Sequence, residues 1–154
     1  MSSGPHAVFD LAADPLVFRA PAGEADIALP WSLAALAQRV GMAFPPREAM
    51  LEAAIAEVED VVMPHVSALR TRGAHVLDVS GAAGAAIVAL ASGPQAREAT
   101  LDEVERLFNR LAYVAAGRPA AVEGLPEDAN LALALLVLRE ILHHVGYAVL
   151  RSVR

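Results

Sequence analysis

Five polar residues interrupt an otherwise apolar stretch near the end of the chain, 138-LREILHHVGYAVLR-151. They follow one another at intervals of mostly three or four: Glu140, His143, His144, Tyr147 and Arg151. Residues with this spacing share one face of an α-helix, so a carboxylate, two imidazoles, a phenol and a guanidinium would form one strip. Such a strip could bind an anionic or polar ligand, because the planar fork of Arg151 suits carboxylate or phosphate.

The same strip could hold a divalent metal ion. Glu140 and His143 have the Glu-x-x-His spacing by which carboxylate-bridged metal bundles take two ligands from one helix, and His144 follows Glu140 by four. The chain has no second Glu-x-x-His, so a two-metal centre is not expected. A single ion at Glu140 and His144 would need ligands from another helix, and we consider Glu57 and Asp60 for that role.

An alternative interpretation of this stretch needs no ligand. The polar strip would be the solvated back of an amphipathic helix, whose buried stripe is then Leu131, Leu135, Leu138, Leu142, Val145 and Val149. The first half of the helix is apolar on every face, which is typical of a central helix and would partly enclose the polar residues. Both interpretations therefore stay open.

Composition excludes several kinds of chemistry. All twelve basic residues are arginine, so the chain cannot form a lysine Schiff base or a phosphate-binding loop of the usual kind. It has no cysteine, which removes disulfides, thiolate nucleophiles and iron–sulfur clusters. We expect no cofactor other than a divalent metal ion, and the catalytic residues of any enzymatic activity stay unassigned. Abundant alanine and arginine without lysine is typical of a GC-rich, bacterial-type composition.

Charge and hydropathy also limit the partners. The formal net charge is −6, and an acidic chain lacks the basic patch that nucleic acid requires. The first residues do not resemble a secretory signal. The longest apolar segment, 129-ANLALALLVL-138, is about half as long as a bilayer-spanning helix. We expect a soluble, cytoplasmic protein that binds neither membrane nor nucleic acid.

The apolar pattern predicts helices and a few strands. Ser32 and Gly41 are suited to begin and end one helix, and Thr100 with Glu103 has the spacing of a capping box. We predict a β-hairpin, a strand and four helices: a hairpin of 16–20 with 25–30, a strand over 74–80, and helices over 32–41, about 46–63, about 100–116 and from about 126–128 to the last residues. The segment 85–92 fits either a strand or a helix.

The segment 75-HVLDVSGAAGAA-86 has a strand followed by glycines, as in nucleotide-binding folds. Gly81 and Gly84 are present, but the third glycine of that pattern is missing. We see no succession of strands and helices that would complete a parallel sheet. We therefore interpret 81–84 as a tight turn.

These observations predict one globular domain over 1–154, of α+β class and mainly helical, with about four helices and a small antiparallel hairpin or sheet. A nearly all-α bundle is the alternative, and the final helix should be the most buried element and a dimer seam. Because 56% of residues are hydrophobic and no strong catalytic motif appears, we favour a non-catalytic interaction protein that acts as a homo-oligomer and docks a protein partner. The alternative is a small metal- or anion-binding enzyme or ligand-binding domain that uses the C-terminal strip.

Overall fold

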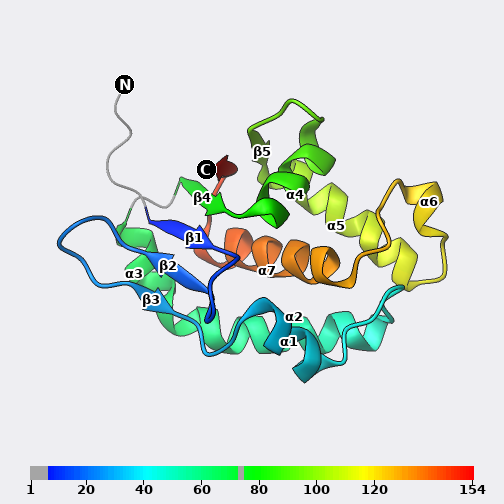
Figure 1. The fold of residues 1–154 in the computed structure, drawn as a ribbon, viewed down its shortest axis with the longest axis horizontal. Helices are drawn as coiled ribbons and strands as arrows, with labels where there is room; N and C mark the ends of the chain where they lie inside the picture. The colour runs from blue at the N-terminus through cyan, green and yellow to red at the C-terminus, as the bar shows by residue number, and fades with distance from the viewer. Residues whose placement is uncertain (1–6, 73–74) are drawn as a thin grey trace.

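A mixed six-stranded sheet joins segments from both ends of the chain in the computed structural model, which describes residues 7–72 and 75–154 (Figure 1). The strand order is β3-β2-β1-β4-β6-β5. β1 pairs with β4 and β4 with β6 in parallel, whereas the outer pairs are antiparallel. The strands are β1 (Val8–Asp10), β2 (Val17–Arg19), β3 (Ile27–Ala28), β4 (Val76–Ser80), β5 (Glu98–Thr100) and β6 (Val149–Val153).

One long helix, α7 (Ala129–Val145), is the centre of the helical part and lies between α2 and α5 (Figure 1). It also contacts α1, α3 and α4. The other helical elements are α1 (Leu33–Val40), α2 (Glu48–Val62), the 3-10 turn η1 (Met63–His65), α3 (Val66–Thr71), α4 (Ala82–Ser92), α5 (Leu101–Ala115) and α6 (Ala120–Glu123). Every residue from 132 to 138 is buried, so α7 is enclosed by its own chain and does not offer the dimer seam expected from the sequence.

Every second residue of the central strands points to the same side of the sheet and contributes to the core. Leu77 and Val79 of β4, Phe9 of β1 and Leu150 of β6 are almost completely buried, because residues two apart on a strand face the same side of a sheet. α4 packs closely on this side at Gly84. The Cβ atom of an alanine at Gly84 would lie 2.8 Å and 2.9 Å from the two γ-methyl carbons of Val79, so the close approach requires glycine.

Several local predictions are confirmed. The Ser32 side chain accepts a hydrogen bond from the backbone N–H of Ala35, and Gly41 ends α1 in the left-handed conformation. Thr100 and Glu103 form the capping box at the start of α5. The segment 85–92, which fitted a strand or a helix, lies within α4.

The predicted fold class is wrong, because the sheet is larger and the last helix is shorter than expected. β2 and β3 do form the hairpin, but they are the edge of a six-stranded α/β sheet. α7 ends at Val145, where Gly146 has a φ of 92° and the N–H groups of Gly146 and Tyr147 donate to the carbonyl of Leu142. Residues 149–153 then form β6, which the spacing of the sequence had placed on the helix.

The interpretation of 75–86 must also be corrected. β4, Gly81 and α4 form a strand–turn–helix unit, and β4 has a parallel neighbour on each side. The sequence concealed this sheet because its partners, β1 and β6, lie near opposite ends of the chain. Within the described residues, no helix is long and apolar enough to cross a membrane.

The contact between Gly84 and Val79 gives a prediction for stability. Alanine normally stabilises a helix interior by about 1 kcal/mol relative to glycine. In Gly84→Ala the overpacking against Val79, about 1–3 kcal/mol, should outweigh that gain, so the free energy of unfolding falls. In a Val79→Ala background the same substitution should be stabilising. Urea unfolding of the four proteins measures this, and an equal stabilisation in both backgrounds would contradict the packing.

Candidate metal centre

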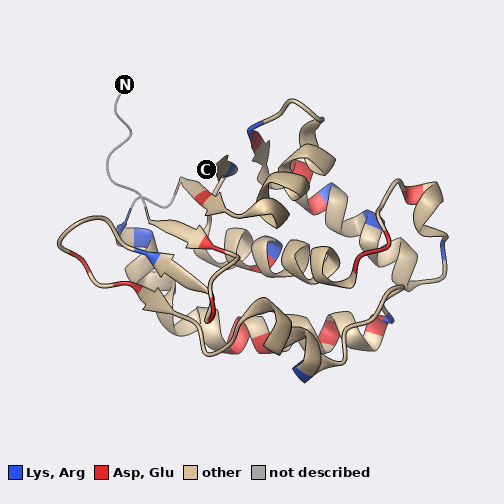
Figure 2. Ribbon diagram, in the orientation of Figure 1, with Lys and Arg blue, Asp and Glu red and all other residues tan. Residues whose placement is uncertain are grey.

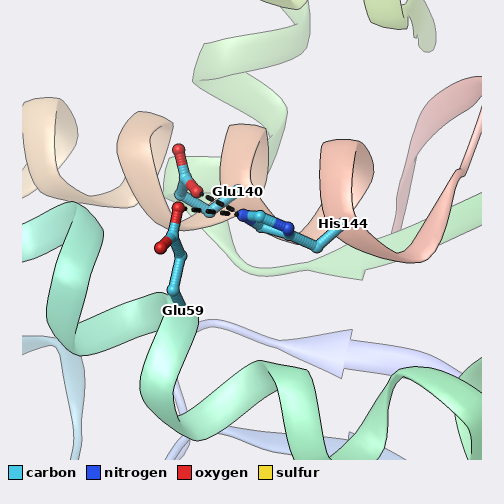
Figure 3. A group of neighbouring side chains, drawn as sticks. All are labelled: Glu59, Glu140 and His144. Atoms are coloured by element: carbon cyan, nitrogen blue, oxygen red, sulfur yellow. Dashed lines mark hydrogen bonds and ion pairs between the residues drawn. The ribbon is translucent and has the colours of Figure 1, made fainter.

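Three side chains from two helices converge at the contact between α2 and α7 (Figure 3). The Nε2 atom of His144 lies 3.0 Å from Oε2 of Glu140 and 3.2 Å from Oε1 of Glu59. One ligand atom from each residue falls within 4.8 Å of the other two. Glu59, Glu140 and His144, called here the Glu–Glu–His cluster, could therefore hold a metal ion.

The helix contact itself positions the cluster. Glu140 and His144 are one turn apart on α7, so their side chains point to the same place. On α2 the buried residues Ala54, Val58 and Val62 form the side that faces the core, and Glu59 is next to Val58 at its edge. Figure 2 shows several acidic positions along α2, and Glu59 is the one whose carboxylate reaches His144.

The three side chains of the cluster differ in solvent exposure, from the buried Glu140 to the partly exposed Glu59. Glu140 is 1% exposed, the side chain of His144 is 22% exposed and that of Glu59 is 43% exposed. A cation among the three donors would thus have protein on the Glu140 side and solvent access on the Glu59 side. Three protein ligands with one open side resemble the arrangement of catalytic zinc sites, whereas structural zinc sites are closed by four ligands.

Arg139 and Glu105 continue the network on the other side of α7. Arg139 Nη1 donates to Oε1 of Glu140 at 2.5 Å, and its Nε donates to Oε2 of Glu105 on α5 at 3.1 Å. Burial acts to lower the pKa of Arg139, but the hydrogen bonds to Glu140 and Glu105 outweigh it and raise the pKa above its ordinary value. The buried carboxylate of Glu140 therefore has a permanently charged partner.

The structure brings together only part of the predicted site. Glu140 and His144 are in the cluster, but Glu57 pairs with Arg39 on α1 at 2.9 Å and Asp60 is exposed. His143 also turns away: its side chain is 56% exposed, and Nδ1 lies 3.6 Å from Oε1 of Glu105. The α2 residue in the cluster is Glu59, whose carboxylate lies 3.2 Å from Nε2 of His144 and which was not among the residues considered from the sequence.

Tyr147 and Arg151 lie outside α7, so the single strip of five polar residues does not exist. Tyr147 follows the helix end and is buried, and burial raises its pKa to about 12 although Arg72 acts to lower it. Arg151 is on β6, where Nε and Nη2 donate to the two carboxylate oxygens of Asp78 on β4 at 2.6 Å and 2.9 Å. This hydrogen-bonded pair raises the pKa of Arg151 and occupies its fork.

Comparison with known proteins identifies the fold. No family model matches the sequence, and no curated protein matches it. Among solved structures, an Aquifex aeolicus member of the Ppx/GppA protein family matches 98% of this chain and 52% of its own, with a TM-score of 0.70 and 14% identity. An exopolyphosphatase-like protein matches 97% of this chain and 55% of its own, with a TM-score of 0.64 and 12% identity. The chain thus has the fold found in these proteins and spans about half their length.

This likeness corrects the functional prediction. A further solved structure, described as an Aquifex aeolicus Ppx/GppA phosphatase, has a TM-score of 0.62 and 15% identity over 98% of this chain. The expectation of a mainly helical, non-catalytic interaction protein is therefore wrong, because the α/β fold is one that occurs in enzymes. High apolar content misled that prediction: the apolar residues fill the interior around α7 and the sheet.

Tyr147 gives a prediction for the pH dependence of stability. Its pKa is 10.0 in an ordinary environment and about 12 in the folded protein. The folded state thus favours the neutral phenol, and this stabilisation is complete below pH 10 and lost as the pH rises through 12. The loss should be about 3 kcal/mol, measured by urea unfolding between pH 9.5 and 12.

The controls for this titration are favourable, since the chain has no lysine or cysteine and only two tyrosines. Tyr147→Phe should flatten the pH dependence, whereas Tyr113→Phe, at the exposed tyrosine, should leave it in place. A decline that survives in Tyr147→Phe would show that another group causes it.

Proposed function

We propose that this protein is a metal-dependent enzyme domain in which Glu59, Glu140 and His144 hold one divalent transition-metal ion. The observation that supports it most strongly is the convergence of one imidazole nitrogen and two carboxylates from separate helices on one point with an open side. The sequence-based alternative of a metal-binding domain is retained in this form, with Glu59 replacing Glu57 and Asp60. The cytoplasmic location expected from the sequence is part of the proposal.

The donor set indicates the kind of ion. Imidazole suits zinc and other first-row transition metals, and carboxylate oxygens accept these ions as well. A bound ion of this kind polarises a substrate oxygen or lowers the pKa of a bound water. The side chain of Glu59 is the most exposed of the three, so a substrate would enter from the α2 side.

The reaction class rests on analogy of fold. The matched structures are described as a phosphatase and as exopolyphosphatase-like, which supports phosphate ester or anhydride hydrolysis as the reaction of this chain. This chain covers about half the length of those proteins, and an activity that needs their other half is not part of the proposal. The Glu–Glu–His cluster, in contrast, lies wholly within this chain.

Metal binding is tested by isothermal titration of Zn²⁺ into chelator-treated protein. The wild type should bind one ion per chain through the cluster. Replacing only the outer partners of metal ligands costs about 10- to 100-fold in affinity, so losing a ligand in His144→Ala or Glu59→Gln should cost at least that much.

Matched controls exist for both variants. His143→Ala removes the neighbouring imidazole, and Glu57→Gln removes the neighbouring carboxylate on α2. Neither should change the affinity by more than about twofold, since both side chains point away from the cluster. Equal losses in His143→Ala and His144→Ala, or no binding by the wild type, would reject the proposed site.

The reaction class has a separate test. With Zn²⁺ or Mn²⁺ bound, the protein should hydrolyse p-nitrophenyl phosphate, and a chelator should abolish the release of nitrophenolate. His144→Ala should be inactive at metal concentrations that saturate the wild type, while His143→Ala stays active. Metal binding without hydrolysis of p-nitrophenyl phosphate would leave the site in place and refute the phosphate-ester reaction.

A further inference from the structure

The carboxylate of Glu140 has different partners at its two oxygens. Oε1 accepts from Nη1 of Arg139, while Oε2 faces Nε2 of His144. Because Glu140 is 1% exposed, solvent does not compete for either oxygen. A cation in the Glu–Glu–His cluster would therefore find one free oxygen of Glu140, namely Oε2.

Arg139 is itself held on two sides. Its Nε donates to Glu105, and its guanidinium carbon lies 4.9 Å from the ring centroid of Phe108, which is buried on α5. Guanidinium has no lone pair to offer a metal and keeps its positive charge at any pH the protein survives. The guanidinium of Arg139 therefore occupies Oε1 of Glu140, and its positive charge repels a metal ion that approaches that oxygen.

This arrangement limits the coordination number that the cluster can supply. Ca²⁺ takes six to eight oxygen ligands and commonly uses a bidentate carboxylate, and Mg²⁺ prefers an octahedron of oxygens. The cluster offers one nitrogen, one oxygen of Glu140 and the exposed carboxylate of Glu59. Zn²⁺ is satisfied by three protein ligands and one open position.

We propose that Arg139, held by Glu105 and Phe108, keeps Glu140 monodentate and thereby makes the cluster selective for Zn²⁺-type ions over Ca²⁺. Arg139 acts here as a positioning residue, since it contacts the ligand and not the ion. The inference rests on the proposed function, because it needs the cluster to bind a metal, but it makes a claim of its own about which metal.

The experiment measures the dissociation constants for Zn²⁺ and Ca²⁺ by competition with a chromophoric chelator, and compares their ratio between variants. Arg139→Met keeps an apolar contact with Phe108 and frees Oε1 of Glu140. Glu140 can then turn to a bidentate position, so Ca²⁺ should bind more tightly and Zn²⁺ no better. The Ca²⁺-to-Zn²⁺ ratio of dissociation constants should fall by about 10-fold or more, the scale on which outer partners of a ligand act.

Two further variants separate this effect from charge and from folding. Arg106→Met removes one positive charge from the neighbouring helix α5, where Arg106 Nε donates to the carbonyl of Asp102, and should leave the ratio within about twofold. Glu105→Gln leaves Arg139 in place but loosens it, and should lower the ratio in the same direction as Arg139→Met. It provides the test if Arg139→Met does not fold, as judged by circular dichroism.

The outcomes distinguish the two proposals. If the wild type binds no Zn²⁺ in the cluster, the proposed function fails. If the wild type binds Zn²⁺ and the ratio is the same in the Arg139 and Glu105 variants, the selectivity role of Arg139 is wrong and the metal site stands. A fall in the ratio for Arg139→Met and Glu105→Gln, with none for Arg106→Met, supports the inference.

Discussion

The burial of one carboxylate, Glu140, determines the arrangement around the central helix. An ionised carboxylate removed from water is costly unless charged and hydrogen-bonding groups surround it. Here Arg139 takes one oxygen, His144 faces the other, and Glu59 and Glu105 complete the network from the helices on either side. The contacts of α2 and α5 with α7 therefore include polar side chains at this level, in an interior that is otherwise mainly apolar.

The sheet and the central helix support each other. α7 is buried along its middle, and α4, which packs directly on Val79 through Gly84, joins the helices to β4. After Gly146 the chain returns as β6 beside β4, where Asp78 and Arg151 pair across adjacent strands. The helix that carries Glu140 and His144 is thus anchored at its end by the sheet, and this rigid support suits a site whose ligands must keep their geometry.

The features that could be predicted from the sequence are those that depend on neighbouring residues. The caps at Ser32 and Thr100 depend on residues a few positions apart, so they could be recognised. β1 and β5 are three residues long and pair with distant segments, so no local pattern indicates them. β6 was missed because Arg151 follows Tyr147 by four, the spacing of a helix turn. Gly146 after His143 and His144 was the local signal for a helix end. To predict that Glu59 belongs to the cluster, one would have to know which edge of α2 contacts α7, and the sequence does not show this.

In the proposed site, one metal ion binds the single imidazole of His144 together with carboxylate oxygens. X-ray absorption at the zinc edge, on protein loaded with one equivalent of Zn²⁺, reports the ligands of the ion directly. We expect one imidazole, with nitrogen and oxygen ligands at about 2.0–2.2 Å. A first shell of oxygen alone, or of two imidazoles, would contradict the assignment of the cluster as the metal site.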